Sequence, residues 1–185
     1  MINEIKNDAQ HRMDQAITHT IMELNKIRTG RANPDLLNGI MIDYYGTPTP
    51  LNQLANISVP EPRLITIQPW EKTILNDIER AIINNNLGLT PNNNGQVILL
   101  PIPALSEERR RDLIKVVHNL IEDGRVAVRN VRRDANHSLK EYQKEENISE
   151  DEIKRAEDEI QKMTDDHIER FAQIQTDKEN EIMEV

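Results

Sequence analysis

Cysteine is absent from this 185-residue chain, and aromatic side chains make up only 3% of it. Without cysteine the protein has no disulfide, no thiolate metal site and no cysteine nucleophile. With so few aromatic residues, the core must be built mainly from aliphatic side chains. The longest apolar run, residues 97–105, is interrupted by two prolines and is far shorter than the ~20 residues that cross a bilayer. Because residues 1–6 also lack a signal-peptide pattern, we expect a soluble cytoplasmic protein with no membrane partner.

Patterns that carry catalysis or metal binding are missing as well. The five histidines are scattered, with no paired spacing of the kind that holds zinc. Gly88 and Gly95 are isolated, so no glycine-rich loop cradles a phosphate, and no serine lies in a GxSxG turn. His167 falls on an apolar helical stripe, which favours a buried, hydrogen-bonded histidine over a metal ligand. We therefore expect no enzyme activity, no metal and no cofactor.

Acidic residues dominate the composition, but unevenly. The formal net charge is −9, yet residues 106–144 hold ten basic and seven acidic side chains, whereas residues 145–185 hold five basic and fifteen acidic ones. The acidity therefore belongs to the C-terminal segment, and a local basic surface is more informative about partners than the net charge.

Arginines recur at helical spacing inside the basic segment. At 100° per residue, Arg125, Arg129 and Arg132 fall within about 60° of one another, and Arg133 lies on their flank. We call these four residues the arginine face. The apolar stripe of the same helix lies roughly 105° away, so one side packs while another presents guanidinium groups. Because arginine matches phosphate bidentately, and aromatic residues for stacking bases are missing, the pattern favours folded RNA as the partner.

A plainer interpretation of the arginine face is a solvated surface balanced by Glu122, Asp123 and Asp134, and spacing alone leaves both open. A second basic segment surrounds Gly30, where Arg28 precedes and Arg31 follows the glycine. Cations at the C-terminal end of a helix complement its dipole, so this segment also has a structural interpretation.

Three segments predict long amphipathic helices. The first covers residues 2–29, the second begins after Ser106 and reaches residue 145, and the third begins at Ser149 with a capping-box pattern. Gly124 lies on the apolar stripe of the second helix, where it indicates either close backbone packing or a bend. Matching stripes and a short turn at residues 146–148 predict an up-down-up bundle.

Residues 31–105 differ in composition, since they hold all nine prolines and four of the six glycines. They contain short β-rich runs at 39–45, 64–68 and 97–100 and a helical pattern at 73–85. We therefore predict an α+β protein: an antiparallel three-helix bundle, residues 1–30 with 106–185, and a small β/α/β domain inserted at 31–105. The two connections, 30–32 and 103–106, predict a hinge at Gly30, Arg31, Ala104 and Leu105.

Several long motifs resemble the ribosome recycling factor family, and the resemblance runs in order along essentially the whole chain. They are residues 26–34 (KIRTGRANP), 44–51 (YYGTPTPL), 107–110 (EERR), 126–136 (VAVRNVRRDAN) and 148–151 (ISED). Motifs of this length and order are specific. The departures are conservative, except that Gly124 could loosen the helix that carries the arginines.

The resemblance implies a bundle and a β/α/β domain in a near-L outline similar to transfer RNA. It implies a monomer that binds the large ribosomal subunit after termination and, with elongation factor G and GTP, splits the ribosome into subunits. Arg132 matches the family's ribosomal RNA contact, Arg129 and Arg133 share its motif, and Arg28 and Arg31 match by sequence alone. The alternative from another class is a coiled-coil adaptor with no RNA-directed role.

Overall fold

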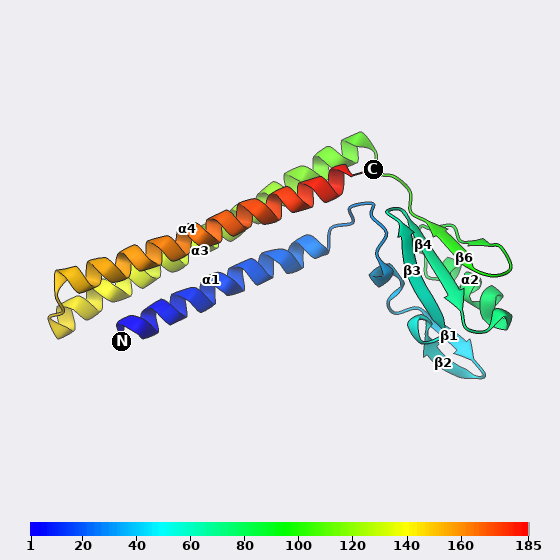
Figure 1. The fold of residues 1–185 in the computed structure, drawn as a ribbon, viewed down its shortest axis with the longest axis horizontal. Coiled ribbons are helices and arrows are strands. Elements are labelled where there is room, and N and C mark those ends of the chain that lie inside the picture. The colour runs from blue at the N-terminus through cyan, green and yellow to red at the C-terminus, as the bar shows by residue number, and fades with distance from the viewer. Residues whose placement is uncertain (185) are drawn as a thin grey trace. The chain divides into compact units, whose positions relative to one another are not determined.

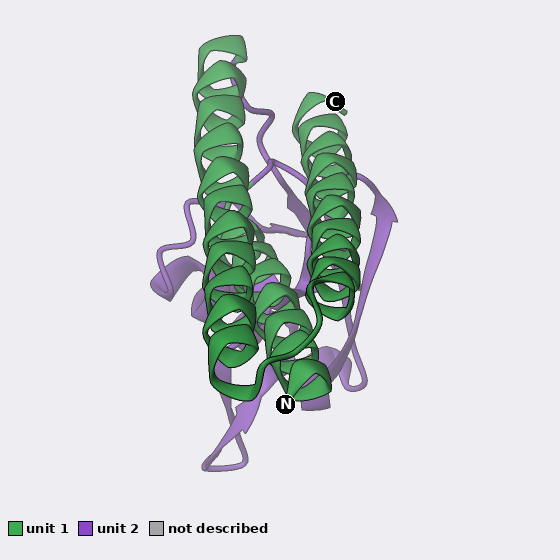
Figure 2. Cartoon of the chain, turned by 90° about the vertical axis from the view of Figure 1, so that its left-hand side faces the viewer, with its two compact units in different colours: residues 1–28, 107–184 green, residues 29–106, 185 purple. Residues whose placement is uncertain are grey.

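The computed structural model describes residues 1–184, which form two compact units. Unit 1 joins Met1–Arg28 to Glu107–Glu184, and unit 2 is Thr29–Ser106 (Figure 2). The predicted domain boundaries lie one or two residues from these. Val185, which the prediction assigns to the bundle, lies outside the described residues.

Over the described residues, unit 1 consists of three helices, α1 (Ile2–Asn25), α3 (Glu107–Glu146) and α4 (Glu150–Met183) (Figure 1). Contacts at two levels give their directions. Along α1, Arg12 and then Thr20 lie beside Asp134 and then Gly124 of α3. Lys6 and then Asp14 lie beside Glu159 and then His167 of α4. With the α3–α4 turn, this makes α3 antiparallel to both other helices, as the up-down-up prediction requires. The predicted α+β class, with a helical bundle and an inserted domain, is confirmed.

Local sequence explains where the bundle helices begin and end. Ser149 caps α4, because its Oγ accepts from the backbone N–H of Glu152 at 3.3 Å. The helix α1 ends at Asn25, four residues before the predicted end, because Lys26 and Ile27 donate to carbonyls three residues back. Such bonds tighten the last turn and stop the helix.

The bundle core is a continuous aliphatic stripe on each helix, and most of it was predicted. At three positions the buried residue is one step further along the chain. Because each helix faces two neighbours, its buried stripe is wider than that of a two-helix seam, and the side chain that points between the neighbours is the more buried one. These three residues are Ile17, Ile121 and Thr164; the regular alternation of three- and four-residue steps between apolar side chains predicts Ala16, Leu120 and Met163 instead.

Gly124 is the point at which the three bundle helices approach most closely. A Cβ atom placed on it would lie 2.5 Å from Cε1 of Phe171 on α4 and 2.7 Å from Oγ1 of Thr20 on α1. Both neighbours are buried. The close-packing interpretation of Gly124 is therefore confirmed, and α3 runs through this position without interruption.

Over Thr29–Ser106, unit 2 holds an antiparallel four-stranded sheet in the order β3-β4-β6-β5, a separate hairpin β1-β2, the helix α2 and three short 3₁₀ helices. The predicted run at 39–45 contains β1 and the predicted helix at 73–85 contains α2, whereas β4 and β6 each end one residue beyond the predicted runs at 64–68 and 97–100. The bounds are β1 (Met41–Tyr44), β2 (Thr47–Pro50), β3 (Ala55–Glu61), β4 (Leu64–Pro69), α2 (Leu75–Asn84), β5 (Asn92–Asn93), β6 (Ile98–Pro101), and the 3₁₀ helices Pro34–Leu37, Leu51–Gln53 and Lys72–Ile74.

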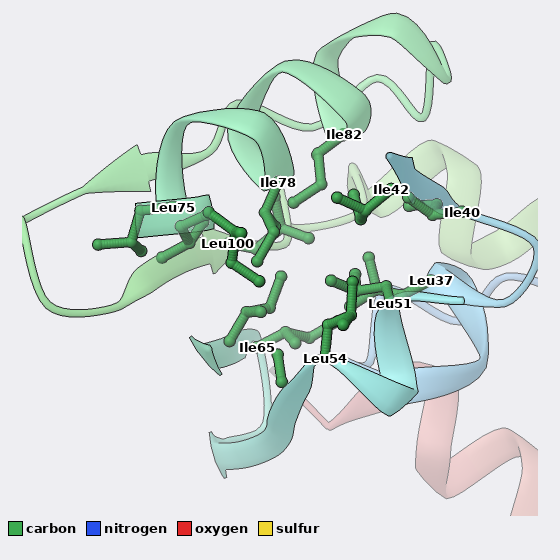
Figure 3. Close-up of a cluster of buried hydrophobic side chains, with 14 of the residues drawn as sticks. Leu37, Ile40, Ile42, Leu51, Leu54, Ile65, Leu75, Ile78, Ile82 and Leu100 are labelled. Carbon is green, nitrogen blue, oxygen red and sulfur yellow. The ribbon is translucent and has the colours of Figure 1, made fainter. Parts of the chain in front are cut away.

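The core of unit 2 is aliphatic throughout (Figure 3). Ile78 and Ile82 of α2 point toward the sheet, where they meet Ile65 from β4 and Leu100 from β6. All four side chains are at most 1% exposed. This arrangement buries one face of the sheet beneath α2 and gives unit 2 a core of its own.

None of the helices within residues 1–184 is long and apolar enough to cross a membrane. The apolar stripes of α1, α3 and α4 are occupied by packing against one another. The coiled-coil adaptor alternative requires a stripe that remains available to a partner helix, and this packing argues against it.

Candidate RNA-binding face of the bundle

The arginine face lies on α3, on the side that borders α4. Arg132 is roughly 38 Å from the start of α3 and about 21 Å from its end, at ~1.5 Å per residue. It therefore lies in the half of the bundle that contains the α3–α4 turn and the beginning of α1 (Figure 1). Arg132 is half-buried and Arg133 is exposed, while the adjacent Val131 packs in the core.

Two of the four arginines share one carboxylate partner within the bundle. Glu122, one helical turn before Arg125, accepts from Arg129 at 3.0 Å and lies 3.6 Å from Arg125. The hydrogen bond from Arg129, together with the charges of Arg129 and Arg125, holds the pKa of Glu122 below its usual value. Because Glu122 remains ionised at neutral pH, it offsets one of the two positive charges, and its direct hydrogen bond is to Arg129.

Arg132 has a different kind of partner. Its Nη1 donates to the side-chain amide oxygen of Gln161 on α4 at 2.9 Å. Among the described residues, Arg132 makes no ion pair with a carboxylate. The guanidinium is therefore held in place by an uncharged group and keeps its full positive charge.

Arg133 also keeps its charge. The solvated-surface interpretation requires the adjacent Asp134 to pair with the arginine face. In the structure Asp134 is paired instead with Arg12 of α1 at 2.7 Å. Arg133 is exposed and makes no hydrogen bond or ion pair within the part of the chain that the structure describes. The two interpretations therefore apply to different parts of the arginine face: Arg125 and Arg129 share a carboxylate, whereas Arg132 and Arg133 have none among the described residues.

The other predicted RNA contacts lie elsewhere. Arg28 is the last residue of unit 1 and is exposed. It lies 16 residues beyond Arg12, which is level with Asp134, so roughly 20 Å of the bundle separates it from Arg132 and Arg133. Arg31 is exposed and belongs to unit 2. Within the bundle, the structure therefore does not bring Arg28 together with Arg132.

The predicted hinge residues all fall inside unit 2. Gly30 has a φ of +77°, and a Cβ on it would lie 3.0 Å from Cγ of Leu105, so the two chain connections pack against each other. Ala104 is exposed. A left-handed backbone with so little space beside it explains why glycine occupies position 30.

Both connections are fixed to one β-turn soon after they enter unit 2. The N–H of Ala32 donates to the carbonyl of Pro62 at 2.7 Å, and the N–H of Ile102 donates to that of Arg63 at 2.8 Å. Pro62 and Arg63 form the turn between β3 and β4. The stretches between these two backbone bonds and unit 1 are therefore short, residues 29–31 on one side and 103–106 on the other.

His167 confirms the prediction of a buried, satisfied histidine. It is 4% exposed, with Nδ1 2.7 Å from the carbonyl of Met163 and Nε2 3.0 Å from Oδ1 of Asp14. A hydrogen bond from Gln10, that from His167 and the nearby charge of Arg170 hold the pKa of Asp14 below its usual value. This network joins α1 to α4, and no group of three metal-ligating side chains occurs among residues 1–184.

Comparison with known proteins gives a consistent result. A family model described as "Ribosome recycling factor" matches residues 21–183. The ribosome-recycling factors of Geobacillus sp. (strain WCH70) and Syntrophomonas wolfei subsp. wolfei are 53% and 55% identical to this chain, each over 100% of both sequences. The chain belongs to the ribosome recycling factor family. That membership assigns it to the recycling of ribosomes after translation terminates.

Two solved structures from the same family agree in fold over the full length. One is the solution structure of a ribosome recycling factor, with 41% identity and a TM-score of 0.72, covering 100% of this chain and 98% of that one. The other is titled as models of the Thermus thermophilus ribosome recycling factor and the Escherichia coli elongation factor G bound to the E. coli post-termination complex. It has 43% identity, a TM-score of 0.63 and full coverage of both chains.

Reasoning from the sequence missed the residues of α4 that accept hydrogen bonds from the arginine face of this recycling-factor chain, Gln161 and Gln175. A pattern did exist, because glutamine precedes an acidic residue by four positions at Gln161–Asp165 and again at Gln175–Glu179, where the side chains are hydrogen-bonded. The pattern predicts a contact along α4. It contains no information about which residue of α3 lies opposite, because that depends on the register between the two helices.

Proposed function

We propose that this chain binds the large ribosomal subunit after termination through the arginine face. With elongation factor G and GTP it then splits the post-termination ribosome into subunits. The observation that carries the proposal is the uncompensated charge of Arg132 on a rigid helix. We propose further that the chain acts in the cytoplasm as a monomer and by binding alone, with no bond broken by its own residues.

Electrostatics favours phosphate as the group that Arg132 binds. A guanidinium that is already positioned loses little conformational freedom when it binds, and its fork matches two phosphate oxygens. Arg133, exposed and unpaired among the described residues, adds a second cation next to it. Contacts to the RNA backbone and to its shape suit this surface, because α3 presents no aromatic side chain beside the arginines for base stacking.

The solved relative found on a post-termination complex with elongation factor G supports the choice of partners. In this proposal the bundle grips ribosomal RNA and the free energy for splitting comes from the GTPase. A helix of 40 residues has the length, about 60 Å, to transmit a displacement along the subunit surface.

The direct test is a splitting assay. Post-termination ribosomes are mixed with elongation factor G, GTP and this chain, and subunits are separated by sedimentation. We expect subunits to appear only when all three components are present. Intact ribosomes in the complete mixture would contradict the proposal, and so would hydrolysis of GTP by this chain alone.

We also propose that the connections at residues 29–31 and 103–106 act as a hinge during splitting. Replacing Gly30 by alanine forces a side chain into a left-handed backbone and against Leu105, which should stiffen or distort the connections. Binding to the large subunit should persist, while the rate of splitting should fall several-fold.

The matched control for the hinge is Gly95→Ala. Gly95 has a φ of +85°, so the backbone strain is comparable, but a Cβ there meets nothing within 4 Å and the residue is remote in sequence from both connections. The hinge proposal requires that only Gly30→Ala slows splitting. Equal rates for the two variants would contradict it.

A further inference from the structure

A chain of side chains links the arginine face to α4. Arg132 donates to Gln161 at 2.9 Å, and Gln161 donates through Nε2 to Oδ1 of Asp165 at 2.8 Å. Gln161 and Asp165 are one helical turn apart on α4 and both are exposed. The contact across the helices is therefore made by a glutamine whose other end is already engaged.

The chemistry of the three groups fixes which way the amide points. An ionised carboxylate only accepts hydrogen bonds, and a guanidinium only donates them. The NH₂ end of Gln161 must therefore face Asp165, and its oxygen must face Arg132. Asp165 thus orients Gln161, and Gln161 presents an acceptor to the arginine.

The other arginines show what a charged partner does instead. Arg129 is held by the carboxylate of Glu122, which positions the guanidinium and also cancels its charge. An amide oxygen positions a guanidinium through the same hydrogen bond without cancelling its charge. A cation that must bind phosphate needs its position fixed and its charge retained, and only Arg132 combines the two.

We infer that Gln161 is a positioning residue for Arg132, an uncharged acceptor on α4 that holds the guanidinium in place for ribosomal RNA phosphate. The inference rests on the proposed function and extends it to a second helix. The inference requires that both the neutrality and the length of the Gln161 side chain contribute to RNA binding. Substituting a carboxylate of the same length separates these two properties.

The bundle contains a matched control four turns along α4. Gln175 also accepts from an arginine of α3, Arg125 at 3.5 Å, and also donates to an acid four residues later, Glu179 at 2.9 Å. Arg125, however, already faces Glu122 at 3.6 Å. A carboxylate at position 175 therefore adds the same charge to the same helix, but beside an arginine that already has a carboxylate within 3.6 Å.

The test measures the affinity of the full chain for isolated large ribosomal subunits over a range of salt concentrations. We expect Gln161→Glu to weaken binding by about tenfold and to lower the magnitude of the slope of log affinity against log salt by about one, as the loss of one phosphate contact does. Gln161→Met removes the acceptor but leaves the charge of Arg132, so we expect roughly a threefold loss with the slope nearly unchanged. Gln175→Glu should weaken binding less than twofold.

Folding is monitored by thermal unfolding, because a structural role would lower stability. Attraction between the new carboxylate and Arg132 offsets its repulsion from Asp165, so Gln161→Glu should melt near the wild-type temperature. Combining Gln161→Glu with Arg132→Ala adds a readout that a structural role would not move. If Gln161 acts through Arg132, the tenfold effect should shrink to that of Gln175→Glu in the Arg132→Ala background.

Three results would overturn the inference. The first is an equal loss of affinity for Gln161→Glu and Gln175→Glu, and the second is an undiminished effect of Gln161→Glu when Arg132 is already alanine. In both cases Arg132→Ala alone still weakens binding, so the RNA-binding face survives. The third is wild-type affinity for Arg132→Ala, which would overturn the RNA-binding face and the role of Gln161 together.

Discussion

The two units differ in what they bury. Of the buried polar side chains found in residues 1–184, four lie in the bundle and only Thr29 lies in unit 2. Each helix of a three-helix bundle borders solvent on both sides of its buried stripe, so polar groups at the margin find partners easily. The bundle members are Thr20, Thr164, His167 and Lys178.

The two units also differ in charge. The bundle has the larger net negative charge, −7 for residues 1–30 with 106–185 against −2 for residues 31–105. Even so, its helix α3 presents two arginines that pair with no carboxylate among the described residues. A thin core with polar margins can carry charged side chains at fixed positions on rigid helices. The aliphatic core of unit 2 instead gives it a self-contained body, and its residues 31–105 are net acidic. The comparison therefore supports our proposal that the bundle is the unit that binds RNA.

The largest expected effect comes from opening the core of unit 2. Ile78 on α2 is fully buried, so Ile78→Ala should cost about 2–5 kcal/mol of the stability of that unit. If RNA binding belongs to the bundle, affinity for the large subunit should stay within about twofold while unit 2 melts at a lower temperature. Circular dichroism during heating and a binding titration measure the two properties.

Ile83→Ala is the control on the same helix, because Ile83 is 54% exposed and its truncation should change stability little. A loss of affinity in Ile78→Ala that parallels the melting of unit 2 would contradict the proposal that the bundle alone binds the subunit. It would show that unit 2 contributes to the grip on the subunit.

The next effect concerns the closest contact in the bundle. Replacing glycine by alanine inside a helix normally stabilises it by about 1 kcal/mol. At Gly124 the added methyl would collide with Phe171 and Thr20, so we expect Gly124→Ala to destabilise the bundle by about 1–3 kcal/mol. Urea unfolding measures the difference. Adding Phe171→Leu should restore part of the loss, and a more stable single variant would contradict the close-packing account.

The smallest effect is electrostatic and depends on pH. The pKa of Asp14 is lowered on folding from its usual 3.8, so the unfolded chain binds the proton more tightly. The carboxylate therefore adds stability above pH ~4, which is lost as the pH falls through the lower folded pKa. Since Asp14 is about half exposed, Asp14→Asn should cost less than about 1 kcal/mol at pH 7.

Thermal unfolding of Asp14→Asn and the wild type at pH 7 and pH 3 measures this effect. The difference in melting temperature should shrink at the lower pH. Asp166→Asn, at an exposed position on α4, is the control and should show no such trend. A constant difference between the two pH values would contradict the role given to the charge of Asp14.

Much of the bundle could be predicted from the sequence, because helical periodicity, the Ser149 capping box and the Gly124 stripe position are local patterns. Unit 2 was harder to predict. The strand β2 alternates threonine with proline, β3 contains Pro60, and β5 is two asparagines. All three patterns argue against a strand, and only pairing with neighbouring strands overrides them.

The candidate site could likewise be predicted only in part, because some of its contacts depend on residues that are distant in sequence. The spacing of Arg125, Arg129 and Arg132 on one face follows from helix geometry alone. Which of them is neutralised depends on rotamers along α3 and on the register of α4, and neither is encoded locally. The sequence suggested that Asp134 balances the arginine face, whereas the structure pairs it with Arg12 from α1.

The central claim is that Arg132 of the bundle binds ribosomal RNA as a positioned, uncompensated cation. It is tested most directly by the salt dependence of binding to the large subunit for the wild type, Arg132→Ala and Arg129→Ala. We expect Arg132→Ala to weaken binding at least tenfold and to reduce the salt slope by about one, with Arg129→Ala much closer to the wild type. Equal losses for the two variants, or a loss for Arg132→Ala with an unchanged slope, would contradict the account.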